Sequence, residues 1–417
     1  MTPQTERQAK LQPEPVSPGQ IKAETGSRQS SRRLRVALAW LSFVFLGIPG
    51  GAIGVAWPAI RDTWSLPTAW LGILLLAFTG GYLCGAFVSG RVITRLGLGH
   101  ALLLSSGIIV LGLASFGLSP TWGLLILTSY LLGTGQGILD AGINLHFANH
   151  FSARMMNWLH AFFSIGAAMG PFTVQLVGTT GEGWRLLWLS LALGQLLLTA
   201  GFALTRGNWL HSPEIAASRL EETPSTLATL RRPPVLLGMA LFFVFVGIES
   251  TAGSWSFVLF SETREIDDRM SATWAGLYWI AFALGRIAYG FVAERFVSEK
   301  AVRVLFLAIL LGATMFSLRD FVEISVAGLL LIGMAQAPIF PLLITATPER
   351  LGTGHATNAV GFQISAAGLG IACLPALVGY LATLASLEIL GPFLAVSALL
   401  CLILFHFITR QGQARRR

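Results

Sequence analysis

Apolar stretches of about 20 residues recur along almost the whole chain and are separated by short polar segments. A stretch of this length crosses the hydrocarbon core of a bilayer as a single α-helix. The pattern predicts twelve such helices, at residues 36–59, 69–90, 100–118, 121–148, 157–178, 184–205, 235–260, 272–294, 301–318, 322–346, 356–382 and 389–409. The expected fold class is therefore an all-α membrane protein with twelve transmembrane helices.

A longer polar stretch separates the sixth and seventh predicted spans, so the chain should divide into two six-helix halves. We expect an N-terminal half at 36–205, a cytoplasmic linker at 206–234 and a C-terminal half at 235–409. Residues 1–35 begin with a segment rich in Pro, Gln and Ser, which is typical of disorder, so we expect a disordered cytoplasmic tail there. Residues 410–417 are expected to form a second cytoplasmic tail.

The basic residues indicate the orientation of the chain. If both termini lie on one side, that side holds all but six of the 28 Lys and Arg residues. The exceptions are Arg61, Arg185, Arg264, Arg269 and Arg319, in loops on the other side, and Arg286, within a span. Cytoplasmic loops carry an excess of Lys and Arg. We therefore expect a multi-pass protein of the inner or plasma membrane with cytoplasmic termini. Its net charge of +8 then reflects topology and does not indicate binding to nucleic acid.

The composition agrees with lipid as the solvent. The chain is 54% hydrophobic and 12% charged, about half the 25% charge of ordinary soluble domains. Cys84, Cys373 and Cys401 each lie in an apolar run, which argues against a disulfide framework or a metal site. The sequence also shows no Gly–Lys phosphate loop and no nucleophile elbow. We therefore expect neither an enzyme nor a bound cofactor or metal, and an ion gradient as the energy source.

The two halves repeat each other at an offset of 200 residues. The segment FVFLGI at 43–48 aligns with FVFVGI at 243–248, and Gly133 aligns with Gly333. A register that holds across several spans indicates an internal repeat. Because each copy contains an even number of spans, the two copies should run parallel. Transporters built from such repeats bind their substrate near the midplane, between the repeats.

One loop carries a family signature. The segment GRVITRLG at 90–97, between the second and third spans, resembles the cytoplasmic loop of the major facilitator superfamily, with Thr94 where the signature has Asp. The second copy, GFVAER at 290–295, keeps an acid. In this family an acid and an Arg at the cytoplasmic helix ends can form charge pairs that close the inner gate. The gating residues implied by the resemblance are Gly90, Arg95, Gly290, Glu294 and Arg295.

The fourth and fifth spans are similar to one branch of this superfamily. They read GQGILDAGINLHF and NWLHAFFSIGAAMGP, and resemble the fucose–galactose–proton symporters. In that branch the fourth span carries an acid followed by small residues and Asn, and an Asn opens the fifth span. The resemblance places Asp140 at the position of that acid, with Asn144, Asn157 and His160 around it. The branch also has an acid in its first span, where this chain has Pro49-Gly50-Gly51.

Three ionisable residues, Asp140, Glu249 and Arg286, lie within predicted spans. Each costs about 2.5–3.5 kcal/mol to insert, and such residues usually belong to transport paths or proton relays. None has a charged counterpart at the 200-residue offset, so the scaffold does not require them. We expect all three to take part in proton coupling. Two structural alternatives remain: a hydrogen-bond cluster that joins the fourth span to the fifth, and a buried Glu249–Arg286 salt bridge.

Polar and aromatic residues within the spans are the candidates for substrate contact. Gln136, Asp140 and Asn144 are spaced four apart and share one helix face. The aromatic candidates could instead anchor the helices at the membrane interface, and the amides could instead join helices. The full set is Gln136, Asn144, Asn157, His160, Trp255, Tyr278, Gln336, Asn358 and Gln363.

Together these features predict a monomeric secondary active or facilitative transporter of a small polar solute. Sugar–proton symport by alternating access is the leading hypothesis, with protons and a small-molecule substrate as partners. A drug– or metabolite–proton antiporter of the same fold is the alternative. A sensor or scaffold that transports nothing is a third possibility, and solute flux would separate it from the other two.

Overall fold

The computed structural model describes the chain except for residues 1–17, 179–180, 210–225, 293–298, 352 and 417. All regular structure in the described part is helical, which agrees with the predicted all-α membrane fold. Six long helices form the first half: α2 (Pro18–Thr63), α3 (Leu71–Leu96), α4 (Leu98–Gly117), α5 (Trp122–His150), α6 (Ala153–Val177) and α7 (Gly183–Thr205).

The second half follows after a short helix α9 (Thr226–Leu230). Its long helices are α10 (Pro233–Val258), α11 (Asp268–Val292), α12 (Glu299–Phe316), α13 (Val322–Gln336), α16 (Thr353–Leu384) and α17 (Leu390–Arg416). A π-helical turn at Leu259–Thr263 extends α10. The tenth predicted span is divided into α13 and α14 (Ile339–Thr345), and α15 (Thr347–Leu351) precedes α16.

Each predicted span thus corresponds to helix in the structure. Ten segments in the described part are long and apolar enough to cross a membrane by themselves. The other two spans are α11 and α12, and α12 holds Glu299, Lys300 and Arg303 within its 18 residues. These charges make α12 one of the less apolar spans, although the pattern of apolar stretches still predicts it.

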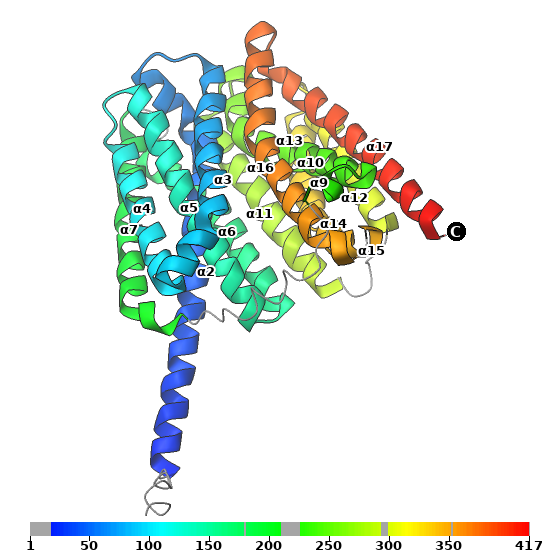
Figure 1. The fold of residues 1–417 in the computed structure, drawn as a ribbon. Helices are drawn as coiled ribbons and strands as arrows, with labels where there is room; N and C mark the ends of the chain where they lie inside the picture. Colours follow the sequence, from blue (N-terminus) through cyan, green and yellow to red (C-terminus); the bar gives the residue numbers. More distant parts are fainter. Residues whose placement is uncertain (1–17, 179–180, 210–225, 293–298, 352, 417) are drawn as a thin grey trace, which may run out of the picture.

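The expected disordered tail is partly helical. Helix α2 begins at Pro18, so residues 18–35 continue the first span as a helix that projects from the bundle (Figure 1). Proline is well tolerated at the start of a helix, and no further proline occurs before Pro49. Residues 1–17 lie outside the described part of the chain. At the other terminus α17 remains helical to Arg416.

The internal repeat is visible in the packing. In the first half α3 packs on α5, α2 on α6, and α4 on α5 and α7. In the second half α11 packs on α13, α10 on α16, and α12 on α13 and α17. These are the same pairs after the 200-residue shift. The two halves are therefore two copies of one helix arrangement, which stand side by side (Figure 1).

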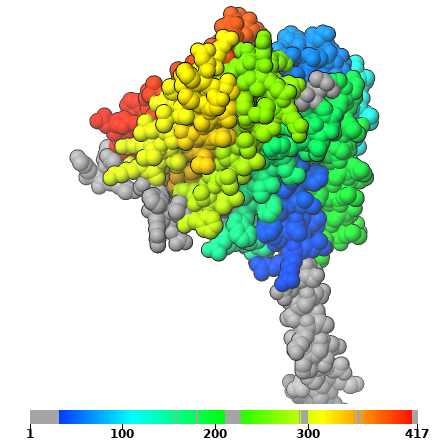
Figure 2. Space-filling model, turned by 180° about the vertical axis from the view of Figure 1, so that it is seen from behind, coloured from blue at the N-terminus to red at the C-terminus, as the bar shows by residue number. Residues whose placement is uncertain are grey.

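Three pairs of long helices make the most extensive contacts between the halves in the described part of the chain. Helix α3 contacts α16 (Figure 1), α6 contacts α11 on the opposite face (Figure 2), and α2 contacts α10. The repeat exchanges the first two pairs and maps the third onto itself, as a two-fold axis between the halves requires. At this axis a Cβ added to Gly54 would lie 2.5 Å from the carbonyl oxygen of Ser254. Gly54 and Ser254 are themselves 200 residues apart.

The halves pack closely at one end of the bundle. We call the end that carries the ends of α2 at Thr63 and of α16 at Leu384 the distal end, and the end nearer the chain termini the proximal end (Figure 1). Near the distal end a Cβ on Gly72 would lie 2.5 Å from the Cβ of Ala376, and one on Gly276 would lie 2.7 Å from the ring of Phe172. Backbones pack tightly there, so the distal end is closed in this conformation.

Candidate functional site

The acid of the fourth span is held by two hydrogen bonds. Tyr82 on α3 donates its hydroxyl to Asp140 Oδ2 at 2.5 Å, and Asn144 donates its side-chain amide to Asp140 Oδ1 at 2.9 Å. Close helix packing makes the first bond possible, because a Cβ on Gly137 would lie only 2.1 Å from the carbonyl oxygen of Tyr82. The cluster thus joins α5 to α3. The alternative of a cluster that joins the fourth span to the fifth stays a prediction, because the side chain of Asn157 lies outside the described part of the structure.

Gln136 lies one turn before this acid and is buried. Its Nε2 atom has no hydrogen-bond partner within the described residues. Buried polar groups are almost always paired, so this amide nitrogen is able to donate a hydrogen bond in another state of the protein. Asp140 and Asn144 are half-buried. None of the three side chains therefore lies fully exposed on the lipid-facing surface.

The charges of the second half lie apart from this cluster. Glu249 on α10 is half-buried, and its carboxylate makes no hydrogen bond or ion pair with the residues that the structure describes. Arg286 on α11 instead crosses to the first half. It donates through Nη1 to the carbonyl oxygen of His160 at 3.2 Å and to Ser164 Oγ at 3.3 Å, both on α6.

A direct Glu249–Arg286 salt bridge, the second structural alternative, is therefore not present among the described contacts. The two charges still interact electrostatically through space. The guanidinium of Arg286 also lies 4.6 Å from the centre of the Phe282 ring, where a cation–π contact offsets part of its desolvation. Glu249 and Arg286 therefore attract each other without a direct hydrogen bond in the described part of the chain, and Arg286 is instead bound to the opposite half.

His160 binds Arg286 through its backbone carbonyl. Its ring packs edge-on against Phe43, with the two ring centres 5.6 Å apart. The side chain of Asn157 lies outside the described part of the structure. Asn358 is half-buried on α16. The roles expected of these residues stay predictions.

Four candidates of the second half are buried in helix contacts. Trp255 donates its indole N–H to the carbonyl oxygen of Pro375 at 2.9 Å, which ties α10 to α16. Gln336 donates to the hydroxyl of Tyr278, which donates in turn to the backbone of Glu249 at 3.0 Å.

Gln363 accepts a hydrogen bond from Thr347 at 3.1 Å. In this conformation the four side chains join helices, as the alternative interpretation of the amides anticipates. Trp255 is fully buried rather than placed at a membrane interface.

The expected gating residues are only partly described. Gly90 and Arg95 are exposed at the proximal end of α3. Gly290 lies in α11, whereas Glu294 and Arg295 lie outside the described residues. The proposed charge pairs of the inner gate therefore stay predictions.

Tyr82 and Ser164 are the contacts that sequence reasoning missed. Tyr82 lies in an apolar span, with no charged residue near it in sequence to mark it. Only the packing of α3 on α5 brings it to Asp140, 58 residues away. Ser164 is marked by the repeat, because Ser365 stands at the matching position of the second half with a shift of one residue. Its approach to Arg286 depends on the contact between the halves.

The groups in these clusters have side chains that can accept or donate protons and hydrogen bonds. No group of three or more His, Cys, Asp or Glu side chains that could hold a metal ion occurs among the described residues. Two carboxylates and one guanidinium inside a helical bundle can bind or exchange protons and can orient a polar solute.

Comparison with known proteins agrees with this architecture. Residues 39–366 match the model of the Major Facilitator Superfamily. The glucose/mannose transporter GlcP of Bacillus subtilis is 21% identical over 346 residues, which cover 81% of this chain and 85% of that protein. A putative glucose/galactose transporter of Helicobacter pylori is 23% identical over 353 residues, which cover 77% of this chain and 82% of that protein.

Solved structures show the same fold. The nucleoside transporter NupG matches with a TM-score of 0.71 at 13% identity, covering 91% of this chain and 99% of that one. FucP in its outward conformation matches with a TM-score of 0.59 at 16% identity, covering 89% of this chain and 98% of that one. The glucose and galactose transporters among the relatives support the resemblance to the sugar-symporter branch. The chain belongs to the Major Facilitator Superfamily and is a multi-pass membrane transporter.

Proposed function

We propose that this protein carries a sugar-sized polar solute together with protons, by alternating access of residues 36–205 against residues 235–409. The proximal end, where α2 begins and α17 ends, faces the cytoplasm in this proposal, because the segments at this end hold most of the basic residues. Curated relatives described as glucose, mannose or galactose transporters support the substrate class. Uptake across the cell membrane, driven by a proton gradient, is the reaction that we propose.

The proposal depends on one observation. Within the described part of the chain, the Glu249 carboxylate has no direct partner, and it lies close to a cation that binds the opposite half. When Glu249 is ionised, it attracts Arg286 away from α6. When it is protonated, that attraction is lost and Arg286 stays on His160 and Ser164. Proton binding in the second half thereby changes a contact between the halves, which is what coupling requires.

Asp140 has a different part in the proposal. Tyr82 and Asn144 both donate their hydrogen bonds to the carboxylate oxygens of Asp140. Its side chain therefore changes partners if it takes up a proton or a substrate hydroxyl. A sugar hydroxyl could replace the Tyr82 hydroxyl as donor, since the two groups have the same hydrogen-bonding chemistry.

The test is uptake by the purified protein in proteoliposomes with an imposed pH gradient. We expect at least one of glucose, galactose and mannose to accumulate, and a protonophore to abolish the accumulation. Glu249→Gln and Asp140→Asn should lose accumulation but keep counterflow exchange, because they remove the proton site and not the carrier.

Glu182→Gln is the matched control. It neutralises a carboxylate whose ion pair with Arg185 lies within the first half. This variant should accumulate sugar as the native protein does. Sugar accumulation by Glu249→Gln equal to that of the native protein would contradict the coupling role. Extrusion of apolar toxicants without any sugar flux would replace the proposal with the antiporter.

A further inference from the structure

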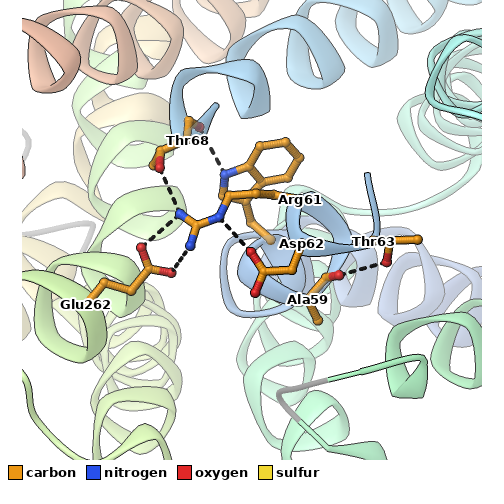
Figure 3. Close-up of polar contacts among 7 residues, drawn as sticks. Ala59, Arg61, Asp62, Thr63, Thr68 and Glu262 are labelled. Atoms are coloured by element: carbon orange, nitrogen blue, oxygen red, sulfur yellow. Dashed lines mark hydrogen bonds and ion pairs between the residues drawn. The ribbon is translucent and has the colours of Figure 1, made fainter. Parts of the chain in front are cut away.

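An ion pair joins the halves at the distal end. Arg61 at the end of α2 donates through Nη1 to Glu262 Oε2 at 2.8 Å and through Nη2 to Glu262 Oε1 at 2.9 Å. Glu262 lies in the π-helical turn that follows α10. Figure 3 shows the guanidinium and the carboxylate facing each other as two parallel hydrogen bonds. This two-point geometry is the strongest form of an Arg–carboxylate contact.

Arg61 has other partners, and all of them belong to its own half. Its Nη1 also donates to Thr68 Oγ1 at 2.7 Å, and its Nε donates to Asp62 Oδ1 at 3.2 Å (Figure 3). The carbonyl oxygen of Thr68 is held by the indole N–H of Trp57 at 3.0 Å. If the distal end opens, Arg61 therefore loses Glu262 alone and keeps a carboxylate beside it.

The internal repeat explains this arrangement. At the 200-residue offset Asp62 matches Glu262, so the two acids around Arg61 are equivalent positions of the two halves. Arg61 itself matches Ser261. One cation thus stands between two acids that the repeat relates, at the point where α2 and α10 meet. Eight residues before Glu262, Ser254 packs against the backbone of Gly54.

We propose that Arg61 and Glu262 form a latch that holds the distal end closed and opens in every transport cycle, when Arg61 is left with Asp62 and Thr68. The idea rests on the proposed alternating-access motion, but not on the substrate or on proton coupling. The side chains of Arg61 and Glu262 are 18% and 32% exposed. Partly exposed ion pairs contribute modestly, so the latch should favour the closed state by about fivefold. A latch of this strength can open without a large barrier.

The test measures access to the distal interface rather than transport. Ser254→Cys places a thiol in the closed contact, where Ser254 is only 5% exposed. A membrane-impermeant maleimide labels this thiol in the purified protein in nanodiscs only when the distal end opens. The native chain, with Cys84, Cys373 and Cys401, measures the background.

In the Ser254→Cys protein, Arg61→Gln and Glu262→Gln should each raise the labelling rate about fivefold. The double variant should label no faster than either single variant, because both changes break the same interaction. Glu182→Gln, which removes an ion pair within the first half at the same end, should leave the rate unchanged.

Unchanged labelling in both single variants would overturn the latch, and so would effects that multiply in the double variant. Equal labelling of Arg61→Gln with and without Ser254→Cys would show general unfolding and would also overturn it. A protein that passes this test yet moves no sugar would refute the proposed function alone.

Discussion

Replacing Gly137 with alanine tests how the acid of the fourth span is positioned. A Cβ at this position would lie 2.1 Å from the carbonyl oxygen of Tyr82 and 2.8 Å from the backbone nitrogen of Ala86. Both atoms belong to the backbone of α3 and cannot rotate away. Since an ordinary non-bonded contact is about 3.5 Å, α3 and α5 would have to separate by roughly 1.4 Å.

Two consequences follow from this separation. Overpacking of a tight interface costs about 1–3 kcal/mol, and glycines in membrane helices serve this close approach. The Tyr82–Asp140 hydrogen bond of 2.5 Å would stretch to roughly 3.9 Å and be lost. We therefore expect Gly137→Ala to lower stability and to impair the proton coupling that we assign to Asp140.

The matched control lies on the same helix. A Cβ on Gly123 has nothing within 4 Å, so Gly123→Ala should be neutral or slightly stabilising because alanine is the better helix former. The assay is the apparent midpoint of thermal unfolding of the purified protein in detergent, for both variants. The reasoning is refuted if Gly137→Ala unfolds at the same temperature as Gly123→Ala.

A second test of this site is Tyr82→Phe, which removes one hydrogen bond and should cost about 0.6–2 kcal/mol of stability. In the Gly137→Ala protein, which has already lost this bond, the same change should cost almost nothing. Thermal unfolding measures both effects. Trp255→Phe removes the hydrogen bond from the indole to the carbonyl of Pro375 and should lower the unfolding midpoint without a change in substrate KM. A shifted KM with an unchanged midpoint would instead place Trp255 in the substrate site. Arg286→Lys keeps the charge but cannot hold His160 and Ser164 in the same geometry, so it should slow sugar exchange, whereas exchange at the native rate would show that the guanidinium is dispensable.

Hydropathy predicted the transmembrane helices because it depends only on the residues within each span. A span is recognisable by its own composition, since every residue of a membrane helix must satisfy its backbone internally and face lipid or protein. The division at 206–234 followed from the longer polar stretch between the sixth and seventh spans, and the repeat added that the two halves are copies of each other. The tail was the exception, because residues 18–35 join a helix that the first span has already started.

The candidate site was predictable only in part. Asp140, Glu249 and Arg286 are conspicuous, because charge inside an apolar stretch is rare and costly. Their partners are not conspicuous. Asp140 meets a tyrosine of α3, and Arg286 meets α6 of the other half. A direct Glu249–Arg286 salt bridge was expected because the two residues lie at a similar depth in their spans. Depth within a span does not determine the direction in which a side chain points.

The sequence by itself determined the number of crossings, the two-fold repeat and the residues whose burial needs an explanation. Only the tertiary structure decided how those residues pair, including the link from Arg61 to Glu262, 201 positions apart. The physical reason is that insertion into a bilayer depends on each segment alone, whereas a hydrogen bond depends on the rotation and spacing of two helices. Those are set by packing, down to the single glycines that let two backbones touch.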